Sequence, residues 1–191
     1  MKINFILFFA LISLQPSITF AETETQLWEK LKNGGLVVLM RHASVEKGRQ
    51  HGKPLLRDPS CVNERKLSDK GKQQAVQIGK VFSSKGVPVE QVLNSPYCRT
   101  TDTARIAFNK SQPVKFLSLL EALSQTQAEA NTEKLSQKIG SYSGKGNLIL
   151  ISHAPNINTI SFETVEPAAF IVLIPMGGNE FEEIGKIKPA N

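Results

Sequence analysis

The spacing of hydrophobic positions changes along this chain, and each spacing predicts a different element. Two unbroken apolar runs, residues 36–40 and 147–152, are typical of strands that are covered on both faces. Between them, apolar residues recur at helical spacing in residues 68–82, in residues 96–108 and in about residues 128–139. The alternation of strands and helices predicts a mostly parallel sheet with helices on both faces.

Shorter segments complete the predicted sheet. Residues 91–93 and 114–117 are expected to form short strands beside the two long ones. Residues 169–174 and 180–187 flank a Pro-Met-Gly-Gly-Asn turn and are expected to pair as a hairpin. The predicted fold is therefore a three-layer α/β sandwich, with a mostly parallel central sheet and an antiparallel C-terminal edge.

The first 21 residues have the pattern of an export signal. Lys2 supplies a positive charge, residues 3–14 are almost wholly apolar, and Ala21 is a small residue at a suitable cleavage point. A membrane anchor is the alternative, but crossing a bilayer takes about 20 apolar residues, which this run does not reach. We expect a signal peptide that is removed on export to the periplasm or the medium. Residues 22–191 would then form a single domain without a membrane span.

Positive charge is concentrated in one window. The chain carries a formal net charge of +6, and residues 47–72 alone hold eight positive and three negative side chains. Without Lys2, the charges outside this window sum to zero. The window is either a solvated loop or an electropositive rim that steers anions to a nearby site. A nucleic-acid partner is not expected, because the window has no aromatic residue on which bases could stack.

The chain has two cysteines, Cys61 and Cys98. In an oxidising compartment an isolated pair is more often bridged than free, so we expect a disulfide, with two free thiols as the alternative. Neither a metal nor another cofactor is expected. The two cysteines and three histidines lack the paired spacing of metal ligands.

Polar residues follow the predicted parallel strands, which is the position where open α/β sheets bind ligands. The first long run ends in Arg41 and His42, the second ends before His153, and a short strand between them ends before Ser95. Ser95 is a good N-cap, so we expect it to start a helix whose first turn carries Arg99. A helix amino end beside an arginine can hold a phosphate or a carboxylate.

Two histidines at this edge of the sheet indicate chemistry, although a single histidine after a strand is more often structural. A neutral imidazole is a competent nucleophile and can carry a phosphoryl group covalently. Two guanidinium groups and a second, protonated histidine could hold the charge of that group without a metal. We therefore expect Arg41, His42, Arg99 and His153 to converge on one phosphate site.

Four motifs resemble, in the same order, those of the histidine phosphatase superfamily, also called phosphoglycerate mutase-like. Residues 39–43 (LMRHA) are similar to its Arg-His-Gly signature, and residues 67–75 (LSDKGKQQA) to its LSxxGxxQA helix start. Residues 94–104 (NSPYCRTTDTA) resemble its SPxxRxxxTA segment, and residues 151–153 its late strand-histidine element. The resemblance spans residues 36–174 and points to a small exported branch of the family.

The resemblance implies a role for each residue of the predicted site. His42 would be the nucleophile that becomes phosphohistidine, while Arg41, Arg99 and His153 would bind the phosphate. The basic window follows the nucleophile directly, which favours the steering interpretation of its charge.

Two features depart from the family pattern. Ala43 stands where the signature has glycine, and we expect its small methyl group to be tolerated. Many members protonate the leaving oxygen with a downstream glutamate, and Glu121 is the best match by order. Its neighbours lack a strong motif, so Glu46 is an alternative donor, and some members work without an obvious acid.

The resemblance predicts an exported, metal-independent phosphomonoesterase of the histidine acid phosphatase type that works through His42. A phosphoglycerate-mutase-like phosphoryl transferase is the alternative enzyme, and a phosphate-binding protein without turnover is the alternative from another class. The expected substrate is a small phosphorylated molecule, such as a sugar phosphate or an envelope glycolipid phosphate; a protein phosphohistidine is a further candidate. Residues 45–64 and 121–130 are expected to choose among these substrates. The oligomeric state is not predicted.

Overall fold

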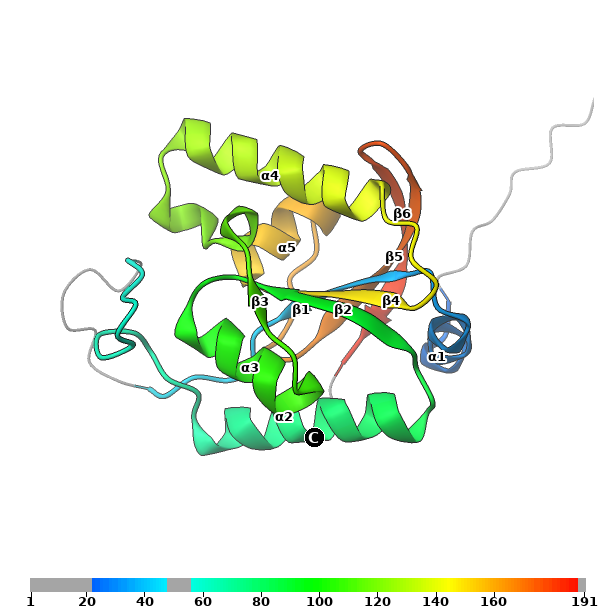
Figure 1. Ribbon diagram of the computed structural model, residues 1–191, viewed down its shortest axis with the longest axis horizontal. Helices are drawn as coiled ribbons and strands as arrows, with labels where there is room; N and C mark the ends of the chain where they lie inside the picture. Colours follow the sequence, from blue (N-terminus) through cyan, green and yellow to red (C-terminus); the bar gives the residue numbers. More distant parts are fainter. Residues whose placement is uncertain (1–21, 48–55, 189–191) are drawn as a thin grey trace, which may run out of the picture.

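The structure, a computed structural model, describes residues 22–47 and 56–188 and is built around a six-stranded sheet (Figure 1). The strands are β1 (Val37–Arg41), β2 (Val89–Asn94), β3 (Gln112–Pro113), β4 (Asn147–Ser152), β5 (Phe170–Gly177) and β6 (Glu180–Ile187). Their order in the sheet is β3-β2-β4-β1-β5-β6. The first four are parallel, whereas β5 pairs antiparallel with β1 and β6 antiparallel with β5. The predicted parallel sheet with an antiparallel C-terminal edge is confirmed.

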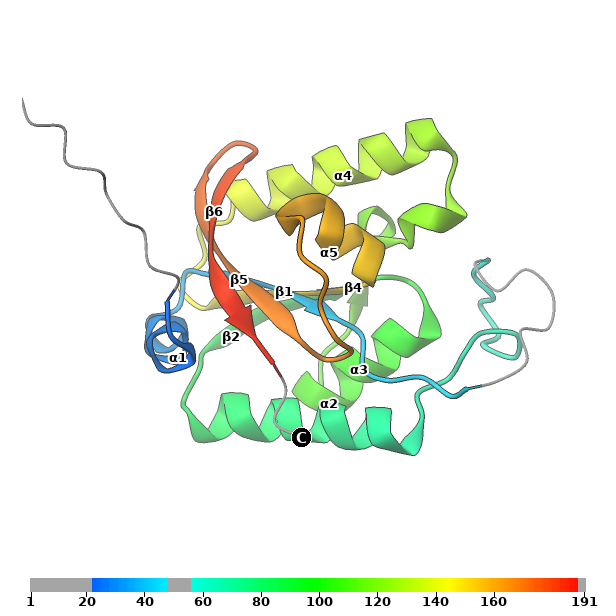
Figure 2. The same ribbon diagram turned by 180° about the vertical axis from the view of Figure 1, so that it is seen from behind.

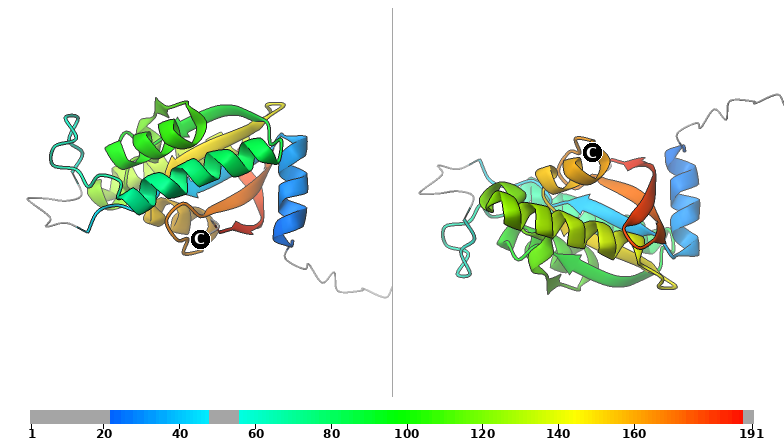
Figure 3. Two further views of the ribbon diagram at one scale, coloured as in Figure 1. Left: turned by 90° about the horizontal axis from the view of Figure 1, so that it is seen from below. Right: turned by 90° about the horizontal axis from the view of Figure 1, so that it is seen from above.

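Helices cover both faces of this sheet. They are α1 (Glu24–Asn33), α2 (Asp69–Ser84), α3 (Cys98–Phe108), α4 (Gln125–Gly140) and α5 (Ala154–Ser161), with short 3₁₀ helices η1 (Lys115–Leu117) and η2 (Leu120–Ala122). Figure 2 shows α4 and α5 on one side of the sheet and α2 and α3 on the other. Helix α1 lies against β6, beside the hairpin (Figure 3). The three-layer arrangement is therefore also confirmed.

Two apolar clusters, one on each face of the sheet, account for the unbroken apolar runs. Successive side chains of a strand point to opposite faces. Val38 and Met40 of β1 accordingly join the cluster under α1 and α2, while Val37 and Leu39 join the cluster under α4 and α5. All four are fully buried. Burial stabilises by about 1.5–3 kcal/mol for each such side chain, so a strand between two helical layers gains from apolar residues at every position.

Two local predictions differ from the structure. Residues 114–117 are not a strand: β3 ends at Pro113, and the chain then turns into η1. Proline has no N–H to extend a strand ladder, and the turn places Leu117 fully inside the cluster under α4 and α5. Helix α5 was not predicted, because its eight residues bury only Ile157 and Ile160 as apolar side chains and give no clear period.

Some predictions fall outside the described residues. These are the signal peptide in residues 1–21 and residues 48–55 of the basic window. Among the residues that the structure does describe, there is no helix with the length and apolar character needed to cross a membrane.

Candidate active site

The residues predicted at the strand ends lie close together because β2, β4 and β1 are neighbours in the sheet. After β1, the N–H of His42 donates to the carbonyl of Ser152 at 3.0 Å. After β2, the N–H of Ser95 donates to the carbonyl of Ile151 at 2.9 Å. His153 follows β4, which lies between these two strands. The ring centroids of His42 and His153 are 5.5 Å apart.

Arg99 of α3 joins the two imidazoles. Its Nε donates to Nε2 of His42 at 3.2 Å, and its Nη2 donates to Nδ1 of His153 at 3.1 Å. The Tyr97 ring packs on the guanidinium with 4.6 Å between its centroid and Cζ, and it meets the His153 ring edge-on at 5.0 Å. Arg99 is only 2% exposed, so these contacts hold its guanidinium in one orientation.

The hydrogen bonds also define which ring nitrogens carry hydrogen. Nδ1 of His42 lies 2.8 Å from the carbonyl oxygen of Ala43, so it carries the hydrogen and donates. Nε2 of His42 is left with the lone pair that accepts from Arg99. On His153 the pattern is reversed, because Nδ1 accepts from Arg99. Nε2 of His153 therefore carries the hydrogen and donates to Oγ of Ser95 at 2.8 Å.

Burial keeps both imidazoles neutral. Desolvation, reinforced by the charge of Arg99, lowers the pKa of His42 to about 3. The same two causes hold the pKa of His153 well below its ordinary value. His153 is therefore uncharged in this structure, and a protonated His153 that holds the transferred phosphoryl group stays a prediction. His42 is therefore uncharged at neutral pH, and a neutral imidazole is chemically able to act as a nucleophile.

Two further guanidinium groups add positive charge. Arg41 ends β1, and its Nη1 donates to the carbonyl of Val165 at 2.8 Å. Its Nε is buried and has no hydrogen-bond partner among the described residues. The charges of Arg41 and of Arg65 both lower the pKa values of His42 and His153, so both act on the rings. Arg65 belongs to the basic window, whose net charge was noticed in the sequence although this residue was not singled out.

The helix that carries Arg99 starts against a buried carboxylate. It begins at Cys98, whose N–H donates to Oε2 of Glu64 at 2.7 Å. The prediction that Ser95 caps this helix is wrong, since its hydroxyl instead bonds His153. The side chain of Glu64 is 2% exposed, and the same Oε2 lies 3.9 Å from Nη1 of Arg99. A single carboxylate thus accepts from the first N–H of α3 and lies beside the guanidinium of Arg99. Sequence reasoning missed it because the contact is tertiary.

This carboxylate belongs to residues 56–67, which we call the 56–67 loop. The loop is attached to the start of α3 by the predicted disulfide between Cys61 and Cys98, which is confirmed. Nε of Arg57 donates to the carbonyl of Pro96 at 3.0 Å. The described part of the basic window therefore lies beside the site, as the steering interpretation requires.

The two candidate proton donors lie apart from these contacts. Glu121 is exposed in η2, and Glu46 is exposed near Lys72, whose pKa it helps to raise. Neither carboxylate forms a hydrogen bond or an ion pair with His42 or His153. The identity of the proton donor stays a prediction. Within residues 22–47 and 56–188, no three His, Cys, Asp or Glu side chains form a group that could hold a metal ion.

Comparison with known proteins gives the family and the fold. Residues 37–143, a range with Arg41, His42 and Arg99 but without His153, match the family model described as histidine phosphatase superfamily (branch 1). The solved structure of the protein histidine phosphatase SixA with tungstate is 16% identical, with a TM-score of 0.58, over 81% of this chain and 97% of that chain. No match is found among curated protein sequences.

Two further solved structures share the fold. Mycobacterial glucosyl-3-phosphoglycerate phosphatase is 14% identical, with a TM-score of 0.54, over 78% of this chain and 96% of that chain. Phosphoserine phosphatase from Entamoeba histolytica, solved with 3-phosphoglyceric acid, is 15% identical, with a TM-score of 0.55, over 80% and 96%. At these identities the likeness shows the fold alone. The family model, however, matches more than half of the residues, and the chain therefore belongs to the histidine phosphatase superfamily, in branch 1.

Proposed function

We propose that this protein hydrolyses phosphate monoesters through a phosphohistidine on His42. The observation that carries the proposal is the position of Arg99, whose guanidinium contacts Nε2 of His42 and Nδ1 of His153 at once. The groups that would bind a phosphate and the nitrogen that would attack it are thus one hydrogen bond apart. Such prearranged donors need little reorganisation as charge develops in the transition state.

The first step transfers the phosphoryl group to the enzyme. The phosphate oxygens accept hydrogen bonds from Arg99 and Arg41, which frees the lone pair on Nε2 of His42. Nε2 then bonds to phosphorus while the bond from phosphorus to the leaving oxygen breaks. The ring becomes positively charged, and its Nδ1 hydrogen, which donates to the carbonyl of Ala43, stabilises that charge.

The leaving oxygen takes up a proton in this step. We propose Glu121 as the donor, with Glu46 as the alternative. Both carboxylates lie apart from His42, and the leaving oxygen lies on the side of phosphorus that faces away from this nucleophile. General acid catalysis contributes typically about 10²- to 10⁴-fold, so the reaction proceeds more slowly without it.

The second step releases phosphate. Water bonds to phosphorus as the bond from phosphorus to Nε2 of His42 breaks, and the electron pair returns to the ring. Phosphate leaves as HPO₄²⁻ with one hydrogen of the water, the other proton of the water returns to the carboxylate that protonated the leaving oxygen, and the imidazole is neutral again. The low pKa of His42 favours this return to the uncharged ring.

Electrostatics support a dianionic ligand. The charges of Arg99, Arg41 and Arg65 all act on His42, and Glu64 offsets part of them near Arg99. These guanidinium groups supply the positive charge that metal ions supply in other phosphatases. The proposed mechanism accordingly routes no step through a metal.

We include in the proposal a small phosphomonoester as substrate and export of the mature protein. A sugar phosphate or an envelope glycolipid phosphate would fit an exported enzyme. The disulfide between Cys61 and Cys98 supports export, since such bonds persist in oxidising compartments. Mass spectrometry of the protein from its native host tests this part, with Glu22 expected as the first residue.

Rapid quenching tests the phosphohistidine. The chain from Glu22 onward is mixed with ³²P-labelled phenyl phosphate and quenched in acid or in base within milliseconds. Wild type is expected to retain label that is stable in base and lost in acid, followed by release of free phosphate. His42→Asn is expected to retain no label and to release no phosphate, while thermal unfolding shows that it is folded.

The other outcomes distinguish the alternatives. A binding protein would be stabilised by inorganic phosphate without ever releasing phosphate from the ester. A mutase would transfer the label to a second position of the product. Wild-type turnover in His42→Asn would overturn the proposed nucleophile.

A further inference from the structure

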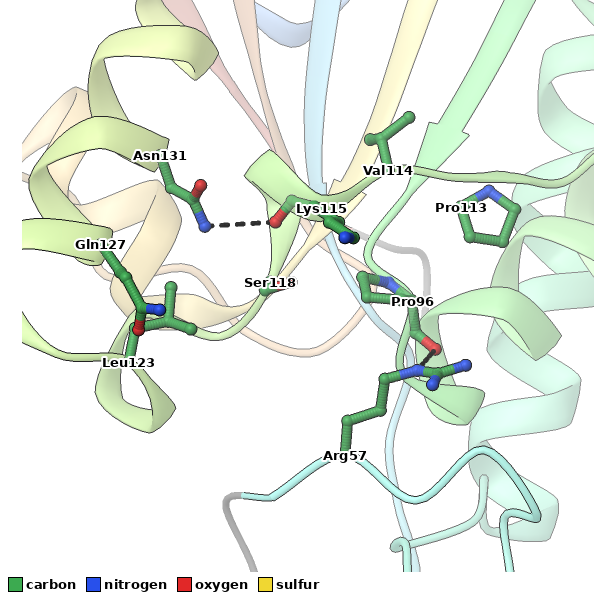
Figure 4. A pocket seen from close by; sticks show the side chains of 9 residues that line it. All are labelled: Arg57, Pro96, Pro113, Val114, Lys115, Ser118, Leu123, Gln127 and Asn131. Atoms are coloured by element: carbon green, nitrogen blue, oxygen red, sulfur yellow. Dashed lines mark hydrogen bonds between the residues drawn. The ribbon is translucent and has the colours of Figure 1, made fainter.

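A pocket of about 560 Å³ lies at the carboxyl ends of β2 and β3 (Figure 4). Three segments far apart in the sequence contribute to its lining: the 56–67 loop with Arg57, the chain after β3 with Lys115, and the first turns of α4 with Gln127 and Asn131. The volume lies in the range of small-molecule sites. Its position at the strand ends is where α/β sheets bind ligands.

The polar groups that line this pocket are suited to an anion. Both charged side chains of the lining, Arg57 and Lys115, are positive. Arg57 uses Nε to donate to Pro96, and no other hydrogen bond of its guanidinium occurs among the described residues. Oε1 of Gln127 accepts from the N–H of Ser124 at 3.2 Å, so its Nε2 is the group left to donate. The pocket therefore carries two positive charges and further donors, without an acid.

Two residues that line the pocket are linked to the phosphate site. Pro96 lines the pocket, and Ser95 directly before it accepts the hydrogen bond from His153. Ser118 also lines the pocket, and its carbonyl accepts from Nδ2 of Asn156 at 2.9 Å. Asn156 belongs to α5, the helix that begins directly after His153. A group attached to a phosphate at the imidazoles thus has this pocket as its neighbour.

We propose that the pocket binds the leaving group of the substrate and that Arg57 and Lys115 select leaving groups with a second anionic group, either a carboxylate or another phosphate. This inference rests on the proposed phosphatase function. Val114 and Leu123 supply apolar walls for the carbon skeleton. A neutral leaving group fits the same space but forms no ion pair, so its ester is the poorer substrate.

Three esters of similar size test the charge preference. Glycerol 3-phosphate has a neutral leaving group, 3-phosphoglycerate adds a carboxylate, and glycerol 1,3-bisphosphate adds a second phosphate. Wild type is expected to have a higher kcat/KM for one or both charged esters, mainly through a lower KM. Which charged ester is preferred identifies the second anion as carboxylate or phosphate.

The residues are tested by substitution. Lys115→Gln and Arg57→Gln are each expected to reduce the preference for the charged ester by about fivefold, the upper range for an exposed ion pair. Lys115→Gln is decisive, because the Lys115 side chain forms no hydrogen bond among the described residues, whereas Arg57→Gln also loses the bond to Pro96. The matched control is Lys145→Gln, an exposed lysine before the amino end of β4, which should leave the preference unchanged.

The outcomes separate this inference from the proposed function. Hydrolysis of all three esters at equal kcat/KM, or an unchanged preference in Lys115→Gln, overturns the leaving-group site and leaves the phosphatase proposal intact. Failure of wild type to release phosphate from any ester overturns the phosphatase proposal itself.

Discussion

The strand-end cluster of His42, Ser95, Arg99 and His153 and the 56–67 loop lie against each other, but they are held in different ways. The cluster follows three adjacent strands, and backbone hydrogen bonds of the sheet position it. An isolated β-bridge joins the end of the loop to the segment after β1. A disulfide and side-chain hydrogen bonds join the loop to the start of α3 and to Pro96 just before it. The chemistry thus depends on the rigid part of the fold, while the loop adds charge and shapes the pocket.

The largest effect on activity is expected from a substitution in the cluster. Arg99→Met removes the donors to both imidazoles and to the bound phosphate, and should reduce kcat/KM for phenyl phosphate by about 10³-fold. The matched control is Arg105→Met, an exposed arginine on the same helix, which should keep wild-type activity. Steady-state kinetics measures both, and thermal unfolding reports the fold. A loss below tenfold in Arg99→Met would contradict the central role of this side chain.

The disulfide should matter more for stability than for catalysis. Cys61 and Cys98 are 37 residues apart, and closing a loop of that length lowers the entropy of the unfolded chain. The double variant Cys61→Ser/Cys98→Ser is expected to lose about 4 kcal/mol of unfolding free energy, measured by urea denaturation. Phenyl phosphate turnover should fall much less than in Arg99→Met. Complete loss of turnover in a folded protein would mean that the cluster depends on the loop.

Glu64 belongs to the loop and also lies beside Arg99 of the cluster. Glu64→Gln keeps the size of the side chain but removes the charge beside Arg99, and its amide cannot accept at both Cys98 and Asp58. The unfolding free energy is expected to fall by about 2 kcal/mol and kcat by about tenfold. Glu133→Gln, an exposed glutamate in α4, is the control. A fall in stability without any change in kcat would mean that Glu64 stabilises the loop but does not affect catalysis.

The strand-end cluster was predictable from the sequence because its positions follow from topology. Apolar runs define β1 and β4, and parallel strands bring the residues after them, His42 and His153, to one edge of the sheet. The same reasoning failed for Ser95, whose local sequence favours a cap. In the fold its hydroxyl faces the imidazole of His153, 58 residues further along and directly after β4.

The 56–67 loop was less predictable because its contacts are long-range and irregular. Glu64 accepts a hydrogen bond from the start of a helix 34 residues away, and no hydrophobic periodicity in the sequence predicts such a contact. The basic composition of the window and the cysteine pair were the features of this loop that could be recognised in the sequence. The regions expected to choose the substrate, residues 45–64 and 121–130, contribute Arg57 and Gln127 to one pocket, but the sequence could not bring them together.

The smallest effect is expected in the pH dependence of the unfolding free energy, to which the cluster and the loop contribute in different pH ranges. The pKa of His42 is about 3 in the folded protein, against an ordinary value of 6.5. Between these values the unfolded chain binds one more proton, so the unfolding free energy falls as the pH drops below 6.5, by about 2 kcal/mol at pH 5 from this residue. His42→Asn should therefore lose about 2 kcal/mol less than wild type between pH 7 and pH 5, measured by urea denaturation.

The loop titrates in a different range. Hydrogen bonds, the largest from the Ser60 side chain, lower the pKa of Asp58 to about 2 from an ordinary 3.8. Its contribution to stability is present above pH 3.8 and is lost only as the pH falls towards 2. The interval from pH 7 to pH 5 therefore reports the cluster and not this loop carboxylate. Equal losses in wild type and His42→Asn would mean that His42 keeps an ordinary pKa, and the neutral nucleophile would lose its physical basis.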